Sequence, residues 1–161
     1  MVSQTGLQEL GVVELTRDDR APYRAREHVT SWVGSSHPAR EMLILATSEL
    51  VTNAVTHADL GHGRCWVLVQ LARGVDFFRL AVTDPGSVFS QPYRIPLQAP
   101  RLGRNAETGR GLGIVASLSR GRWGTYVLPQ TAQRVVWCHL DAVELLLPEA
   151  QERTDHRLKP A

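Results

Sequence analysis

Residues 39–58 most constrain the fold, because they predict one long helix with an apolar face and a polar edge. The apolar side chains recur at the helical spacing i, i+3, i+4 and i+7: Leu43, Ile44, Ala46, Leu50, Val51, Ala54 and Val55. Such a face has to pack against a second layer. Glu49, Asn53 and His57 follow one another at four-residue spacing, so they share one edge of the helix. That edge is a candidate functional site.

The other segments predict two more helices and five strands. The helices are expected at residues 21–33 and 112–118, and the strands at 11–16, 65–71, 77–83, 123–128 and 134–140. Residues 73–76 favour a hairpin between the second and third strands. Because helices and strands are segregated along the chain, we predict an α+β fold: a two-layer α/β sandwich with a mixed, mostly antiparallel sheet and helices on one face.

A chain of 161 residues is long enough for one domain with a core. We expect the domain at residues 10–147, an N-terminal extension at 1–9 and a polar C-terminal tail at 148–161. The absence of a long apolar run or a signal-peptide pattern favours a cytoplasmic protein with no membrane partner. The net charge of +2 and the absence of a basic run argue against direct nucleic-acid binding. Cys65 and Cys138 are expected to be buried thiols, with no zinc-type spacing.

Lysine usage excludes several kinds of site. Lys159 is the only lysine in the chain, and it lies in the expected tail. A Walker A loop needs a lysine on the nucleotide phosphates, and an ordinary protein kinase needs a lysine on a strand. A Schiff-base enzyme needs a lysine in its core. If the chain binds a nucleotide, it therefore uses another architecture.

A second pattern, at residues 84–86, follows a predicted strand. Alone, Asp-Pro-Gly indicates a turn. The functional interpretation is that the Asp84 carboxylate accepts a hydrogen bond from an exocyclic amine such as adenine N6. Gly86 would then let the backbone approach the flat base closely.

A third pattern, the glycine-rich segment, opens the helix predicted near residue 112. It consists of Gly109, Arg110, Gly111, Leu112 and Gly113. Free backbone N–H groups at a helix start, together with the helix dipole, favour phosphate binding. The spacing Gly111-x-Gly113-x-x-Ala116 also fits a dinucleotide fingerprint formally. We discard that reading because a long proline-containing loop, not a strand, precedes it.

Together the three patterns describe one Mg–nucleotide site. The amide oxygen of Asn53 is a hard ligand suited to Mg²⁺, and Glu49 positions or deprotonates the attacking group. The loop at residues 87–108 would cover the triphosphate. The alternative for Glu49 and Asn53 is a solvated helix face, and for His57 a structural role at the helix C-terminus. Three arginines reach the γ-phosphate or remain solvated: Arg101, Arg104 and Arg110.

These motifs resemble those of the GHKL ATPases, also called the Bergerat or histidine-kinase-like ATP-binding fold. The N-box resemblance is at residues 49–58, the G1 resemblance at 84–87 and the G2 resemblance at 107–113, within a similarity that covers about residues 10–140. Within this group the chain is similar to small stand-alone anti-sigma-factor serine/threonine kinases of the actinobacterial type.

The resemblance implies a site for ATP and Mg²⁺, with Asn53 as the metal ligand, Glu49 as the general base and Asp84 as the residue that recognises adenine. It also implies a sigma factor and a STAS-type anti-anti-sigma protein as partners and transcriptional control as the output. Homodimers are common in the family, so a homodimer is a further expectation. The last strand of the family often carries a threonine near the adenine, and the closest position here is Val135. The alternative is a module that binds ATP and sequesters its partner with negligible kinase activity.

Overall fold

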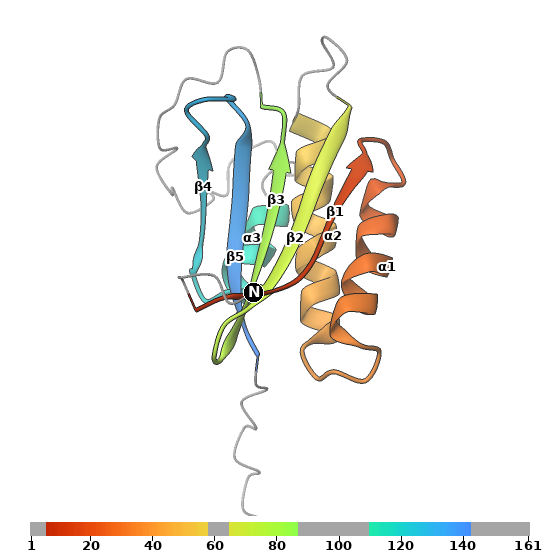
Figure 1. Cartoon of the computed structure of the whole chain (residues 1–161), viewed down its shortest axis with the longest axis vertical. Coiled ribbons are helices and arrows are strands. Elements are labelled where there is room, and N and C mark those ends of the chain that lie inside the picture. Colours follow the sequence, from red (N-terminus) through yellow and green to blue (C-terminus); the bar gives the residue numbers. More distant parts are fainter. Residues whose placement is uncertain (1–5, 58–64, 87–109, 143–161) are drawn as a thin grey trace, which may run out of the picture.

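The computed structural model describes residues 6–57, 65–86 and 110–142. Its elements are β1 (Gln8–Thr16), α1 (Ala21–Val33), α2 (Arg40–His57), β2 (Trp66–Arg73), β3 (Phe77–Asp84), α3 (Arg110–Leu118), β4 (Trp123–Val127) and β5 (Arg134–Asp141). The strands form one sheet in the order β1-β2-β3-β5-β4, and each neighbouring pair is antiparallel. Figure 1 shows α2 and α3 behind this sheet and α1 at its β1 side. This arrangement confirms the predicted α+β sandwich.

Local sequence explains where several elements begin and end. Helix α1 has Pro22 in its first turn, where no helical hydrogen bond is lost, and its last residue, Val33, is followed by Gly34 with φ +92°. The N–H of Gly74 donates to the carbonyl of Phe77 at 2.8 Å, which closes the predicted hairpin between β2 and β3.

Two boundaries differ from the sequence prediction. Strand β1 begins at Gln8, not at residue 11, and continues through an irregularity between Glu9 and Gly11. A Cβ on Gly11 would lie 2.1 Å from the Trp32 ring, so the missing side chain at this position leaves room for the ring. Helix α3 begins at Arg110, before the predicted start at residue 112.

The core lies between the sheet and the helices. Alternate residues of the central strands point into it, as the period of a strand requires. These are Val67, Val69 and Leu71 of β2, Phe78, Leu80 and Val82 of β3, and Val136, Cys138 and Leu140 of β5. From α2, Leu43, Ala46, Leu50, Val51 and Ala54 pack against them. Asp84 is the next residue on the inward face of β3, so this face ends in a carboxylate at the border of the core.

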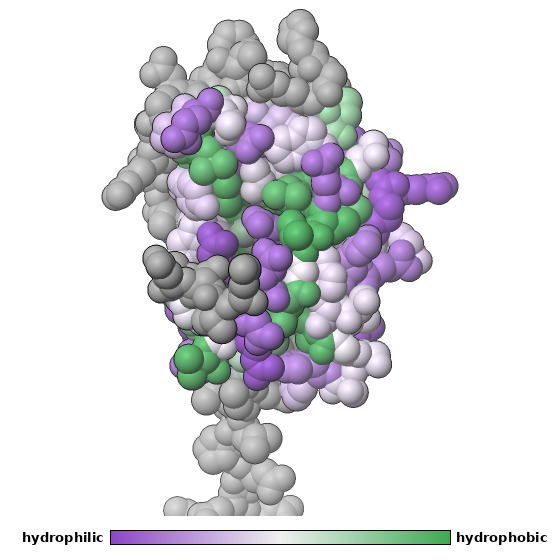
Figure 2. All heavy atoms as spheres, in the orientation of Figure 1, coloured by the Kyte–Doolittle hydropathy of each residue, from purple (hydrophilic) through white to green (hydrophobic). Residues whose placement is uncertain are grey.

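The opposite face of the sheet carries aromatic side chains. The Phe77 ring lies 4.5 Å from the His139 ring, and the Trp137 ring lies 4.9 Å from it, between centroids. Burial, together with the nearby positive charges of Arg79 and Arg122, lowers the pKa of His139. Figure 2 views this face and shows apolar side chains in its middle, between polar ones. Asp84 lies on the other, helical side of the sheet, away from these rings.

The prediction of two buried thiols is correct for Cys138 and wrong for Cys65. Cys138 lies in β5, and burial raises the pKa of its thiol to about 12. Cys65 is exposed because β2 begins only at Trp66, so Cys65 precedes the strand. None of the described helices is long and apolar enough to cross a membrane.

Candidate functional site

Glu49 and Asn53 lie on the polar edge of α2, and both are half-buried. Among the residues that the structure describes, neither side chain forms a hydrogen bond or an ion pair. The Glu49 carboxylate and the Asn53 amide are thus both available to a ligand. His57 is the last residue of α2, as predicted, but its side chain lies outside the described part of the chain.

The first turn of α3 lies directly against Glu49. A Cβ on Gly111 would lie 2.6 Å from the Glu49 Oε2 atom, so any larger residue at position 111 would have to displace the end of this side chain. Leu112 and Gly113 belong to the same turn, whose backbone N–H groups have no helical partners. Gly109 and the side chain of Arg110 lie outside the described residues. The fold therefore brings the first and third sequence motifs together.

Asp84 ends β3 and is 1% exposed. Its Oδ2 atom accepts hydrogen bonds from Nε and Nη2 of Arg134, at 3.0 and 2.8 Å. Its Oδ1 atom accepts one from the N–H of Gly86, at 2.8 Å. The two oxygens have about four acceptor positions, and partners within the described residues fill three of them, which leaves one on Oδ1.

Gly86 has a structural role that the sequence did not reveal. Its φ is +72°, and a Cβ here would lie 2.2 Å from the carbonyl oxygen of Ala132, in the turn between β4 and β5. The predicted close approach to a base stays a prediction. The observed close approach is to the protein's own backbone.

Gly86→Ala is expected to destabilise the fold more than Gly121→Ala. Gly121 has a similar φ of +78° but nothing within 4 Å of its Cβ position, so both variants have the cost of a left-handed alanine, about 1–2 kcal/mol. Gly86→Ala adds the clash with Ala132, about 1–3 kcal/mol. Urea unfolding of both variants measures the difference. If both variants lost the same stability, the backbone near Ala132 would be able to move away from the new Cβ at no cost in free energy.

Arg134 is the site residue that sequence reasoning missed. Asp84 pairs with Arg134 in the sheet register, whereas Thr83 pairs with Val135. Directly paired residues project to the same face, so Val135 lies on the opposite face from Asp84. The residue of the last strand that contacts Asp84 is therefore Arg134, and the expectation that Val135 occupies this place is wrong. Which residue of β5 lies opposite Asp84 depends on the register of two strands distant in sequence, and no local motif predicts it.

Most residues of the other predicted features lie outside the part of the chain that the structure describes. The loop at 87–108, with Arg101 and Arg104, lies outside them. Within the described ranges, no group of three His, Cys, Asp or Glu residues comes together to hold a metal ion. Mg²⁺ commonly binds through one or two protein ligands plus substrate phosphates, so Asn53 beside a triphosphate fits such an ion.

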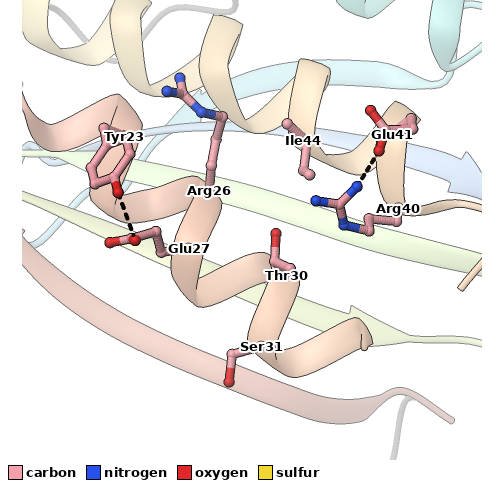
Figure 3. A pocket seen from close by; sticks show the side chains of 8 residues that line it. All are labelled: Tyr23, Arg26, Glu27, Thr30, Ser31, Arg40, Glu41 and Ile44. Atoms are coloured by element: carbon pink, nitrogen blue, oxygen red, sulfur yellow. Dashed lines mark hydrogen bonds and ion pairs between the residues drawn. The ribbon is translucent and has the colours of Figure 1, made fainter. Parts of the chain in front are cut away.

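A separate open groove of about 580 Å³ lies between α1 and α2. Figure 3 shows the side chains that line it: Tyr23, Arg26, Glu27, Thr30, Ser31, Arg40, Glu41 and Ile44. Its charged groups are largely paired with one another or with hydroxyls, as in the Tyr23–Glu27 hydrogen bond and the Arg40–Glu41 ion pair. It contains none of the residues of the three motifs.

The family model for the histidine kinase-like ATPase domain matches residues 15–121, well over half of the chain. The matched segment runs from the end of β1 through α3 and contains Glu49, Asn53, Asp84 and Gly111. No curated protein matches the chain.

Proposed function

The chain belongs to the histidine kinase-like ATPase domain family, and on that premise we propose that it is an ATP-dependent serine/threonine kinase of the anti-sigma-factor type. Its substrate is a STAS-type anti-anti-sigma protein, and its second partner is a sigma factor, so that phosphorylation controls transcription. The observation that carries the proposal is the carboxylate of Glu49, which lies against the first turn of α3 and has no partner among the described residues.

The described residues divide the binding of ATP among three elements. Asp84, at the end of β3, accepts a hydrogen bond from the adenine amine through Oδ1. The first turn of α3 donates backbone N–H groups to phosphate oxygens. Asn53 of α2 supplies an amide oxygen to Mg²⁺, which neutralises developing charge on the phosphates when bound.

In this proposal Glu49 acts as the general base. Its carboxylate accepts the proton of the serine or threonine hydroxyl as that oxygen attacks the γ-phosphorus. The bond from the γ-phosphorus to the β–γ bridging oxygen breaks, and ADP leaves with that oxygen. Phosphoryl transfer depends mainly on positioning and charge stabilisation, which this set of residues can supply.

The proposal is tested by transfer of label from [γ-³²P]ATP·Mg to a panel of purified STAS-domain proteins. We expect labelling of serine or threonine in one of them, and a loss of about 10²–10⁴-fold in rate in Glu49→Gln, with ATP binding retained. Glu41→Gln is a matched control, because Glu41 is an exposed glutamate of the same helix. If none of the STAS-domain proteins in the panel were labelled, the kinase proposal would be contradicted.

The same variant distinguishes the alternative function, in which ATP sets the conformation and partner sequestration is the output. A kinase loses its effect on sigma-dependent transcription when Glu49 becomes glutamine. A sequestering module keeps that effect. A reconstituted transcription assay with both partners separates the two outcomes.

A further inference from the structure

The pairing of Arg134 with Asp84 goes beyond the predicted motifs. Both residues are largely buried, with side-chain exposures of 20% for Arg134 and 1% for Asp84. Both project toward the helical side of the sheet, at the end of β3 and the start of β5. A guanidinium therefore lies beside the carboxylate expected to recognise the base.

Arg134 has donors left after it pairs with Asp84. A guanidinium has five N–H groups in a fixed plane, and two of them, on Nε and Nη2, donate to Asp84 Oδ2. Among the described residues, no acceptor takes the remaining three. The side chain of Arg134 is 20% exposed, so it is not fully enclosed.

The pair thus presents an acceptor beside donors. Among the described residues, Asp84 Oδ1 has one acceptor position left, and Arg134 Nη2 lies 2.8 Å from the other oxygen of the same carboxylate. The Watson–Crick edge of adenine has the complementary order, with the N6 amine as donor beside N1 as acceptor. One planar base edge can therefore satisfy both side chains at once.

We propose that Arg134 is a specificity-determining residue that donates a hydrogen bond to N1 of adenine while Asp84 accepts one from N6. This inference rests on the proposed ATP site and names the residue that completes its recognition of the base. Arg134 takes the place at which Val135 was expected. The planar guanidinium of Arg134 also holds the Asp84 carboxylate in a fixed orientation.

Three nucleotides test the proposal in the unaltered protein: ATP, 1-deaza-ATP, which lacks N1, and 7-deaza-ATP, which keeps N1. A hydrogen bond from a charged donor changes affinity by about 10–100-fold. We expect 1-deaza-ATP to bind more weakly than ATP by that factor, and 7-deaza-ATP to bind like ATP. Calorimetry measures all three dissociation constants. Equal binding of ATP and 1-deaza-ATP would overturn the proposal.

Arg134→Met distinguishes recognition from a merely structural role. If Arg134 contacts N1, the variant binds ATP and 1-deaza-ATP with equal affinity, so the discrimination disappears. If Arg134 only holds Asp84, both affinities fall together and their ratio stays as in the unaltered protein, which would contradict the proposal. Arg122→Met is the matched control, because Arg122 pairs with Asp141 at the other end of β5.

The nucleotide comparison also separates this inference from the proposed function. If the protein binds ATP and 1-deaza-ATP equally well, the proposed ATP site stands, but the proposed role of Arg134 does not. Failure to bind any of the three nucleotides would remove the ATP site and the inference with it. The comparison in the unaltered protein needs no variant, so it stands even if Arg134→Met does not fold.

Discussion

Asp84→Ala is expected to lower the free energy of unfolding by about 3–5 kcal/mol and to abolish ATP binding. The loss of stability is large because the substitution leaves the guanidinium of Arg134, only 20% exposed, without its carboxylate. It also removes the acceptor for the N–H of Gly86, which holds the turn after β3. Urea denaturation followed by circular dichroism measures the first effect, and calorimetry with ATP the second.

The double variant Asp84→Ala/Arg134→Met separates the two effects. Replacing both members of a buried ion pair by apolar side chains is often neutral, so most of the lost stability should return. ATP binding should stay absent, because both groups proposed to contact the base are gone. If Asp84→Ala alone were as stable as the unaltered protein, the ion pair would contribute little to the fold.

Gly111→Ala is expected to slow phosphoryl transfer about 100-fold while the protein stays folded. An alanine Cβ would lie 2.6 Å from the Glu49 Oε2 atom, so the carboxylate has to move. A displacement of about 1 Å at a reacting group can cost about 100-fold in rate. The flexible end of Glu49 moves at little cost, and alanine favours a helix over glycine by up to about 1 kcal/mol, so stability should not fall. Initial rates of transfer and urea midpoints measure the two quantities.

Ser117→Ala provides the control for Gly111→Ala. Ser117 is exposed on the same helix, so this variant changes helix propensity without approaching Glu49. Its transfer rate should equal that of the unaltered protein. A Gly111→Ala variant that transfers phosphate at the full rate would show that the position of the Glu49 carboxylate does not limit the reaction.

The sequence predicted the elements whose information is local. Helix α1 and the hairpin between β2 and β3 follow from proline, glycine and periodicity, and they were correct. The long helix was predicted from its one-sided apolar pattern, and α2 confirms it as Arg40–His57. The start of β1 was placed at residue 11 and not at Gln8, and Cys65 was misjudged because its exposure depends on the exact start of β2.

The features that no local pattern contains were not predicted. The ion pair between Asp84 and Arg134 depends on the register of β3 against β5, two strands separated by 50 positions in sequence. The need for glycine at position 86 depends on the carbonyl of Ala132, across the same register. Glu49 and Gly111 were predicted to share one site, and their close approach in the structure depends on how α3 packs against α2.

The central claim is that Glu49, Asn53, Asp84 and the first turn of α3 form one site for ATP and Mg²⁺. Calorimetric titration of the purified protein with ATP, in the presence and absence of Mg²⁺, tests it most directly. We expect the unaltered protein to bind ATP more tightly with Mg²⁺ than without it, and Asn53→Ala to bind ATP with the same affinity in both conditions. An unaltered protein that binds no ATP in either condition would contradict the claim.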